Sequence, residues 1–210
     1  MSNNIEDLNL VFSTPIWAFV VKDSVKLNLE ILKFIKDLQI KDPDGIKKSN
    51  VLGWHSKDFD MNNKNVLYFF ESIKPNINNV LIDMGWNDTN NKINITSAWS
   101  IINKKKASNA RHIHSNSFIS AVYYVSAPNN CGDILFHDPR EAKVIRKPNK
   151  VKANKLNAEV INITPQPGLL VLFPSYLYHS VSENNSNEDR IIISFNIDIK
   201  LFYTFILISS

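Results

Sequence analysis

Residues 167–181 have the sequence PGLLVLFPSYLYHSV. A run of five apolar residues lies between a glycine and Pro174, a pattern typical of a short, fully buried β-strand bounded by turns. After the proline turn, residues Leu177–Val181 form a second candidate strand, which carries His179. The stretch therefore predicts two consecutive strands of a β-rich core.

Strand-like segments recur on both sides of this stretch, from Lys92 onward. Short apolar or alternating runs are separated by turns rich in proline, asparagine and glycine. Many short strands with turn signals between them are typical of an antiparallel sandwich or jelly roll. The eight predicted strands are 93–101, Arg111–His114, Phe118–Val125, Asp133–Phe136, Ala158–Ile163, Gly168–Phe173, Leu177–Val181 and Arg190–Ile199.

The first half of the chain is expected to be mainly helical. Residues Val25–Ile40 carry their apolar side chains on one stripe, which predicts an amphipathic helix. A second helical region, Asn65–Gly85, contains Pro75, which is expected to kink or split it. Ahead of both, Leu10–Val21 has strand character, and Pro15 favours an edge position. We expect a mainly β (α+β) fold with the helices packed on one sheet.

Length and composition indicate one domain. The chain has 210 residues, of which 44% are hydrophobic and 21% charged, a globular composition. We expect a single domain over 1–210, with a supporting strand and helices in 1–90, a β core in 91–200 and an apolar tail in 201–210. The tail is too short to span a bilayer. It is expected to be a further strand or a buried end, and it leaves homodimerisation open.

Charge and cysteine content bound the partners. The net charge of +4 permits an acidic small substrate or a nucleic acid without arguing for either. No apolar run is long enough for a membrane span, and the polar amino terminus is unlike a signal peptide. The single cysteine, Cys131, excludes an internal disulfide and suits a reducing compartment. A cytoplasmic protein without membrane or nucleic-acid partners is therefore expected.

Three histidines form the strongest chemical signal. Residues His112 and His114 lie two apart in a predicted strand, so their imidazoles are expected side by side on one face. His179 follows 65 residues later, and Arg190 then opens an apolar strand. An arginine that points into a β barrel is costly unless an anion pairs with it, and a dicarboxylate would do so. The pattern indicates a metal ion beside an anionic ligand.

Taken together, these segments resemble the iron(II)- and 2-oxoglutarate-dependent oxygenases, and within them the bacterial and phage group related to the prolyl hydroxylases. The resemblance covers most of the chain, and the family fold is a double-stranded β-helix, a jelly-roll and cupin-like architecture. It is densest in His112–His114, Ser120–Val125, Gly132–Arg140, Pro167–Ser175 and the segments around His179 and Arg190.

The resemblance implies a role for each matching residue. His112 and His179 match iron ligands, and Arg190 matches the residue that pairs with the far carboxylate of 2-oxoglutarate. The expected reaction consumes Fe(II)-bound 2-oxoglutarate and O2, with ascorbate in a supporting role, and hydroxylates a C–H bond with release of succinate and CO2. No catalytic residue is expected beyond the metal centre. Further residues expected to contact the cosubstrate are Tyr124, Ser194, Asn103 and Asn196.

One departure from the family concerns the third iron ligand. Relatives usually have Asp or Glu two residues after the first histidine, where this chain has His114. His114 as a direct ligand is the favoured interpretation. Asp138 could instead supply the carboxylate, or water or an anion could fill the position. Asp138 could also be a turn residue that pairs with Arg140.

The substrate is the least determined part of the sequence reading. Trp54, His55, Trp99 and Arg140 are candidate substrate contacts. A peptide, an amino acid or another small molecule is expected to enter the site. Two alternatives stay open: a metal- or ligand-binding module without catalysis, and a nucleic-acid dealkylase, which would show steeply salt-dependent binding.

Overall fold

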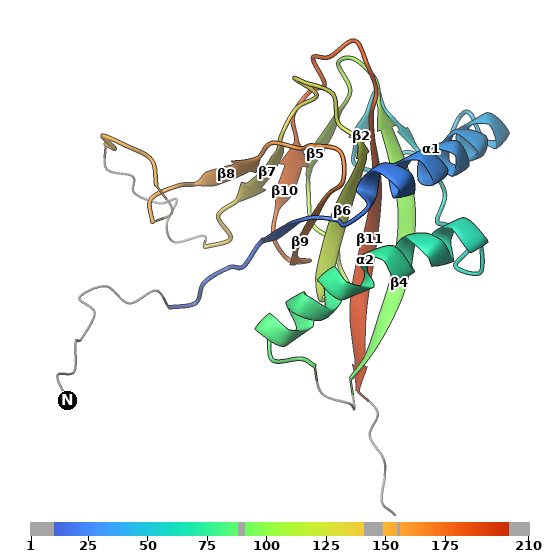
Figure 1. Cartoon of the computed structure of the whole chain (residues 1–210). Helices are drawn as coiled ribbons and strands as arrows, with labels where there is room; N and C mark the ends of the chain where they lie inside the picture. Colours follow the sequence, from blue (N-terminus) through green and yellow to red (C-terminus); the bar gives the residue numbers. More distant parts are fainter. Residues whose placement is uncertain (1–10, 88–90, 141–148, 155, 202–210) are drawn as a thin grey trace, which may run out of the picture.

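The computed structural model describes residues 11–87, 91–140, 149–154 and 156–201. Two helices precede most of the strands, and the strands form two layers (Figure 1). The helices are α1 (Ser24–Lys41) and α2 (Lys64–Asp83). The strands are β1 (Trp17–Val20), β2 (Asn50–Val51), β3 (Trp54–His55), β4 (Asn91–Asn103), β5 (Ser108–His112), β6 (Ile119–Ser126), β7 (Ile134–His137), β8 (Val160–Ile163), β9 (Leu169–Pro174), β10 (His179–Val181) and β11 (Arg190–Leu201).

Two antiparallel sheets make the core. The larger has the order β1-β9-β6-β11-β4-β3 and the smaller the order β2-β5-β10-β7-β8. Strands far apart in sequence are neighbours, since β11 pairs with β4 on one side and β6 on the other. This arrangement confirms the predicted mainly β fold, and all eight strands predicted after Lys92 are present.

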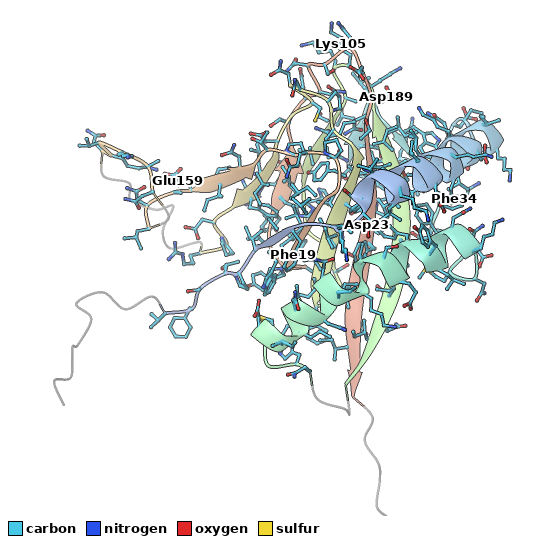
Figure 2. The ribbon with its side chains drawn as sticks, viewed as in Figure 1. Phe19, Asp23, Phe34, Lys105, Glu159 and Asp189 are labelled. Atoms are coloured by element: carbon cyan, nitrogen blue, oxygen red, sulfur yellow. The ribbon has the colours of Figure 1, made fainter. Side chains whose placement is uncertain are left out.

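Both helices cover the outer face of the larger sheet (Figure 1). Leu27, Ile31 and Ile35 of α1 are buried, as the predicted apolar stripe requires. They share one core cluster with alternate residues of β11, among them Ile193 and Phe195. Figure 2 shows side chains filling the space between helices and sheet, and Phe34 packs edge-on against Phe59 with ring centroids 5.3 Å apart. The predicted packing of helices on one sheet is thus confirmed.

Alternation along β11 places the other half of its residues between the sheets. Ile191 and Ile193 face the helices, whereas Arg190 and Ile192 belong to the inner side, where the second core cluster lies. Side chains of a strand point to opposite faces in turn, so this register also brings Ser194 and Asn196 inward. All four inner residues line one cavity, as their shared face predicted.

Some sequence expectations were wrong in detail. α2 is not split at Pro75, which lies on its exposed face, where water can reach the carbonyl group that loses its amide partner. The expected loop after α1 contains the two-residue strands β2 and β3. β5 ends at His112, so His114 lies beyond the strand.

Two predicted features fall where the structure gives no description. Except for Leu201, the apolar tail 201–210 lies outside the described residues, as does much of the basic segment after Arg140. Within the described residues, neither helix has the length and apolar character needed to cross a bilayer.

Candidate metal centre and cosubstrate pocket

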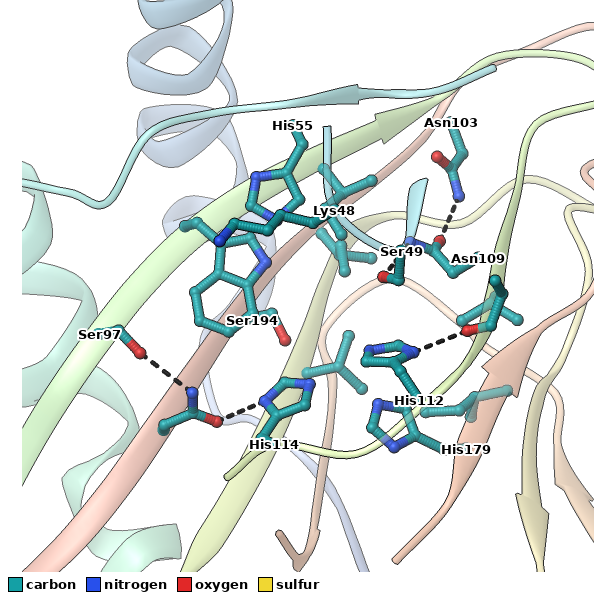
Figure 3. A pocket seen from close by; sticks show the side chains of 18 of the residues that line it. Lys48, Ser49, His55, Ser97, Asn103, Asn109, His112, His114, His179 and Ser194 are labelled. Carbon is teal, nitrogen blue, oxygen red and sulfur yellow. Dashed lines mark hydrogen bonds between the residues drawn. The ribbon is translucent and has the colours of Figure 1, made fainter. Parts of the chain in front are cut away.

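The three predicted histidines meet at one point between the sheets. In the register of β10 with β5, His179 lies opposite His112, and His114 follows two residues after His112. One potential ligand atom from each of the three lies within 4.8 Å of the others. The ring centroids are 4.2 Å apart for His112 and His179, 5.1 Å for His114 and His179, and 5.2 Å for His112 and His114 (Figure 3). This spacing suits a single metal ion.

Backbone carbonyl groups fix the orientation of two of these rings. The Nδ1 atom of His112 lies 2.7 Å from the carbonyl oxygen of Ala110, and that of His179 lies 3.0 Å from the carbonyl oxygen of Leu177. A carbonyl oxygen only accepts, so each Nδ1 must carry the hydrogen. The lone pair is therefore on Nε2 in both rings, the form that binds a metal ion.

Asn196 does the same for the third ring. Its Oδ1 atom lies 2.6 Å from Nδ1 of His114 and also accepts a hydrogen bond of 2.8 Å from the Ser120 hydroxyl. Its Nδ2 atom donates to Oγ of Ser97 at 3.0 Å. Asn196 was expected to contact the cosubstrate. In the structure, its side-chain amide instead bonds to His114 and orients that ring.

Replacing Asn196 with alanine is therefore expected to weaken metal binding without removing a ligand. Loss of such an orienting partner typically lowers metal affinity about 10- to 100-fold. Isothermal titration of Zn(II) into the metal-free chain measures the change. The control is Ser72→Ala, because its hydroxyl donates to a helix carbonyl on the exposed surface. Equal affinity in Asn196→Ala and the native chain would show that His114 needs no such partner.

Burial keeps the three imidazoles neutral. Removal from water lowers the pKa of His112, lowers that of His114 from 6.5 to about 4 and lowers that of His179 to about 3. Mutual repulsion between the rings also opposes protonation of His179. Metal binding requires neutral imidazole, so protons do not compete for these ligands near neutral pH.

The same shifts predict how the stability of the metal-free protein depends on pH. The folded pKa values lie below the unfolded value of 6.5, so the unfolded state binds more protons as the pH falls. Stability is thus full above about pH 6.5 and declines as the pH falls through about 4. Each pKa unit corresponds to about 1.4 kcal/mol, so we expect the Tm to fall by roughly 10 °C. Calorimetry checks this. The variant with both His114→Gln and His179→Gln should lose most of the decline, and an unchanged slope would contradict the assignment.

Arg190 and Tyr124 lie deeper in the same cavity. Nη1 of the buried Arg190 donates to the carbonyl groups of Cys131, Gly132 and Ser182, the last two at 3.2 Å. Gly132 permits this approach, since its φ is +87° and a Cβ there would lie 2.9 Å from Nη1. Nη2 is buried and has no hydrogen-bond partner within the described chain. A buried guanidinium with a free donor fits a bound carboxylate.

The cavity between these groups has a volume of about 890 Å³. This volume is within the range of small-molecule sites, about 300–1,000 Å³. The histidine cluster and Arg190 both contribute to its lining, so a metal ion and an anionic ligand would share one space. Other predicted residues that line it are Tyr124, Ser194, Asn103, Asn196, His55 and Trp99.

The remaining predicted contacts are held in other ways. Ser194 lines the cavity, but its hydroxyl already donates to the carbonyl of Ala121 at 2.9 Å. Asn103 donates through Nδ2 to Oδ1 of Asn109 at 2.8 Å, whereas its own Oδ1 is buried and has no hydrogen-bond partner among the described residues. His55 stacks on Trp99, with ring centroids 5.6 Å apart and planes inclined by 10°.

Three predicted residues do not line the cavity. Trp54 packs in the core beneath the helices and donates through Nε1 to the carbonyl of Asp42 at 2.8 Å, because alternation along β3 turns only His55 inward. Arg140 is exposed and binds Asp138 with two hydrogen bonds of 2.9 Å. Asp138 lies outside the histidine cluster. The alternative of a turn residue paired with Arg140 is thus the arrangement present.

Sequence reasoning missed several polar residues around the site. Ser97 and Ser120 support Asn196, and the period-two pattern of their strands places them inward. Lys48 and Asp58 line the cavity near its entrance. In the sequence, these two residues lie on either side of His55, a predicted substrate contact. Their nearness to His55 was the one signal that could have identified them.

Residues 97–196 match the family model described as "Putative 2OG-Fe(II) oxygenase". The match contains all three histidines and Arg190. The match indicates a 2-oxoglutarate-dependent oxygenase, an oxidoreductase, as the sequence resemblance predicted. No curated relative matches the sequence.

Solved structures similar to this oxygenase share its fold at low identity. A prolyl-4-hydroxylase from Pseudomonas putida has 9% identity and a TM-score of 0.61, covering 89% of this chain and 93% of the other. A prolyl hydroxylase from Trichoplax adhaerens, in complex with a peptide, has 15% identity and a TM-score of 0.61 over 89% and 84%. HygX from Streptomyces hygroscopicus, with nickel, 2-oxoglutarate and hygromycin B bound, has 10% identity and a TM-score of 0.57 over 91% and 84%. These likenesses confirm the double-stranded β-helix.

The residues of the oxygenase fit the groups that the superfamily uses. Three neutral imidazoles with Nε2 free form a donor set suited to iron, and Nη2 of Arg190 is a donor in need of an acceptor. Iron and 2-oxoglutarate, the groups named by the matched family model, thus fit the residues of this site.

Proposed function

We propose that this oxygenase is a dioxygenase that binds Fe(II) through His112, His114 and His179 and hydroxylates a C–H bond of an amino acid, a peptide or another small substrate. The convergence of one potential ligand atom from each of three neutral imidazoles, in a cavity that also holds a buried arginine, carries the proposal. When bound, iron and 2-oxoglutarate activate O2 and supply the oxidising power for hydroxylation, with release of succinate and CO2.

The chain's own residues then bind and orient. Arg190 accommodates the far carboxylate of 2-oxoglutarate through Nη2, and Nη1 stays anchored to backbone carbonyl groups. Tyr124 is buried beside Arg190, and burial raises the pKa of its phenol, so it remains a neutral donor toward the same carboxylate. Apolar side chains of β9 and β11 exclude water from this end of the cavity.

The neutral ligand set distinguishes this site from one with two histidines and a carboxylate. Three imidazoles leave the site one negative charge short of that arrangement. Asn196 accepts from the third imidazole without adding a charge, and among the described residues no carboxylate belongs to the histidine cluster. The dianionic cosubstrate therefore balances a larger share of the metal charge here. Ascorbate would support turnover by keeping the iron reduced.

An anaerobic titration of the metal-free chain with Fe(II) and 2-oxoglutarate tests the proposal. We expect a weak visible charge-transfer band that requires both components, because 2-oxoglutarate would contact the iron at two points. Exposure to O2 should then yield succinate. Iron binding without the band would reject the proposal and favour a metal-binding module that lacks catalysis.

A further inference from the structure

The entrance of the cavity carries two opposite charges that do not pair with each other. Lys48 and Asp58 both line it, and neither forms an ion pair with any described residue. The other cations of the lining are engaged. Lys57 binds Asp42 at 2.9 Å, and the guanidinium of Arg111 lies 4.4 Å from the ring centroid of Tyr178.

Both charges lie around one imidazole. Figure 3 shows Lys48 beside His55 at the edge of the pocket. Lys48, Asp58 and His55 all line the cavity, and although burial is the main cause of the lowered pKa of His55, the Asp58 carboxylate raises that pKa and the Lys48 ammonium group lowers it. They are nevertheless more than 4.0 Å from each other, since they form no salt bridge. Both charges and the stacked pair of His55 and Trp99 line the same cavity.

That stacked pair also offers hydrogen-bonding groups. Nδ1 of His55 lies 2.6 Å from the carbonyl oxygen of Ser56, so Nδ1 carries the hydrogen and Nε2 is left as an acceptor. Nε1 of Trp99 is buried and has no hydrogen-bond acceptor within the described residues. A ligand with both an anionic and a cationic group would satisfy these groups together.

We propose that the substrate is a free α-amino acid, held as a zwitterion with its carboxylate on Lys48 and its ammonium group on Asp58. The proposal rests on the proposed function, because the side chain of the amino acid would then extend toward the histidine cluster. Trp99 forms the bridge in that direction, since its ring centroid lies 5.5 Å from that of His114. A peptide bond at either group would remove one charge, so blocked amino acids should bind less well.

Ligand-observed NMR on the full chain loaded with Zn(II) and 2-oxoglutarate tests this, because zinc takes imidazole ligands and undergoes no redox chemistry. The probes are the twenty L-amino acids, followed by the N-acetyl and carboxamide forms of each binder. We expect at least one free amino acid to bind, and each block to weaken binding about tenfold or more.

Variants assign the two charges. Lys48→Met should abolish the preference for the free acid over its amide, and Asp58→Asn should abolish the preference for the free amine over its N-acetyl form. Lys47→Met and Asp44→Asn, neighbouring exposed charges outside the lining, should change neither. Equal binding of blocked and free forms, or no binding by any amino acid, would overturn the proposal. Calorimetric binding of Zn(II) and 2-oxoglutarate, measured separately, shows whether the proposed function itself has failed.

Discussion

Replacing His114 with alanine is expected to abolish turnover of 2-oxoglutarate and to weaken Fe(II) binding more than about 100-fold. The reason is that Nε2 of His114 is one of three converging donors, and a change to a mere orienting partner already costs about 10- to 100-fold. Anaerobic titration with Fe(II) measures the affinity, and succinate formation measures the turnover. The fold should survive, since His114 lies after the end of β5 rather than within a ladder.

Two matched variants separate a ligand role from general damage. His137→Ala removes another histidine of the smaller sheet, whose Nε2 lies 3.0 Å from the Ser180 hydroxyl and outside the cluster. Asp138→Ala removes the carboxylate that was the alternative third ligand. Both are expected to bind Fe(II) like the native chain. If Asp138→Ala lost the metal and His114→Ala kept it, the three-histidine site would be wrong.

Much of the β core was predictable because its signals are local. Strands such as β9 and β11 are recognisable from apolar or alternating residues between turns. The alternation also predicted that Arg190 and Asn196 share one face, and both line the cavity. The period of a strand predicted that His112 and His114 lie together, and they do, although β5 ends at His112 and His114 lies beyond it. His179 could be added because family resemblance supplied a partner that spacing alone does not.

Long-range pairing determined what the sequence did not reveal. β2 and β3 are two residues each and exist because β5 and β4 supply their hydrogen bonds. That pairing turns Trp54 toward the helices and His55 toward the cavity, a division invisible in the sequence. Asn196 was correctly placed on the inner face, but its bond to His114 spans 82 positions, so only the folded register reveals its use. The pairing of Arg140 with Asp138 is by contrast local, and it was one of the alternatives that the sequence offered.

The second large effect is expected at Arg190. Arg190→Met should weaken 2-oxoglutarate binding about 100-fold or more, because hydrogen bonds to a charged group contribute about 1.5–3 kcal/mol each. Zn(II) affinity should stay near the native value, since Arg190 is not among the clustered ligands. Calorimetric titration of each component in turn measures this split between cosubstrate and metal.

Arg190 also holds the structure together, so stability must be measured beside binding. Its Nη1 atom serves the carbonyl groups of Cys131, Gly132 and Ser182, and leaving them unsatisfied costs about 1–3 kcal/mol for each buried group. Denaturant unfolding should therefore show a loss of stability in Arg190→Met, whereas Arg190→Lys keeps the charge and should recover part of the 2-oxoglutarate affinity. Lys26→Met, which removes an exposed cation of α1 outside the cavity lining, should change neither quantity appreciably. A loss of stability alone cannot distinguish a structural arginine from one that binds the cosubstrate, so the 2-oxoglutarate affinity decides. A folded Arg190→Met chain with native 2-oxoglutarate affinity would show that the free Nη2 donor serves some other ligand.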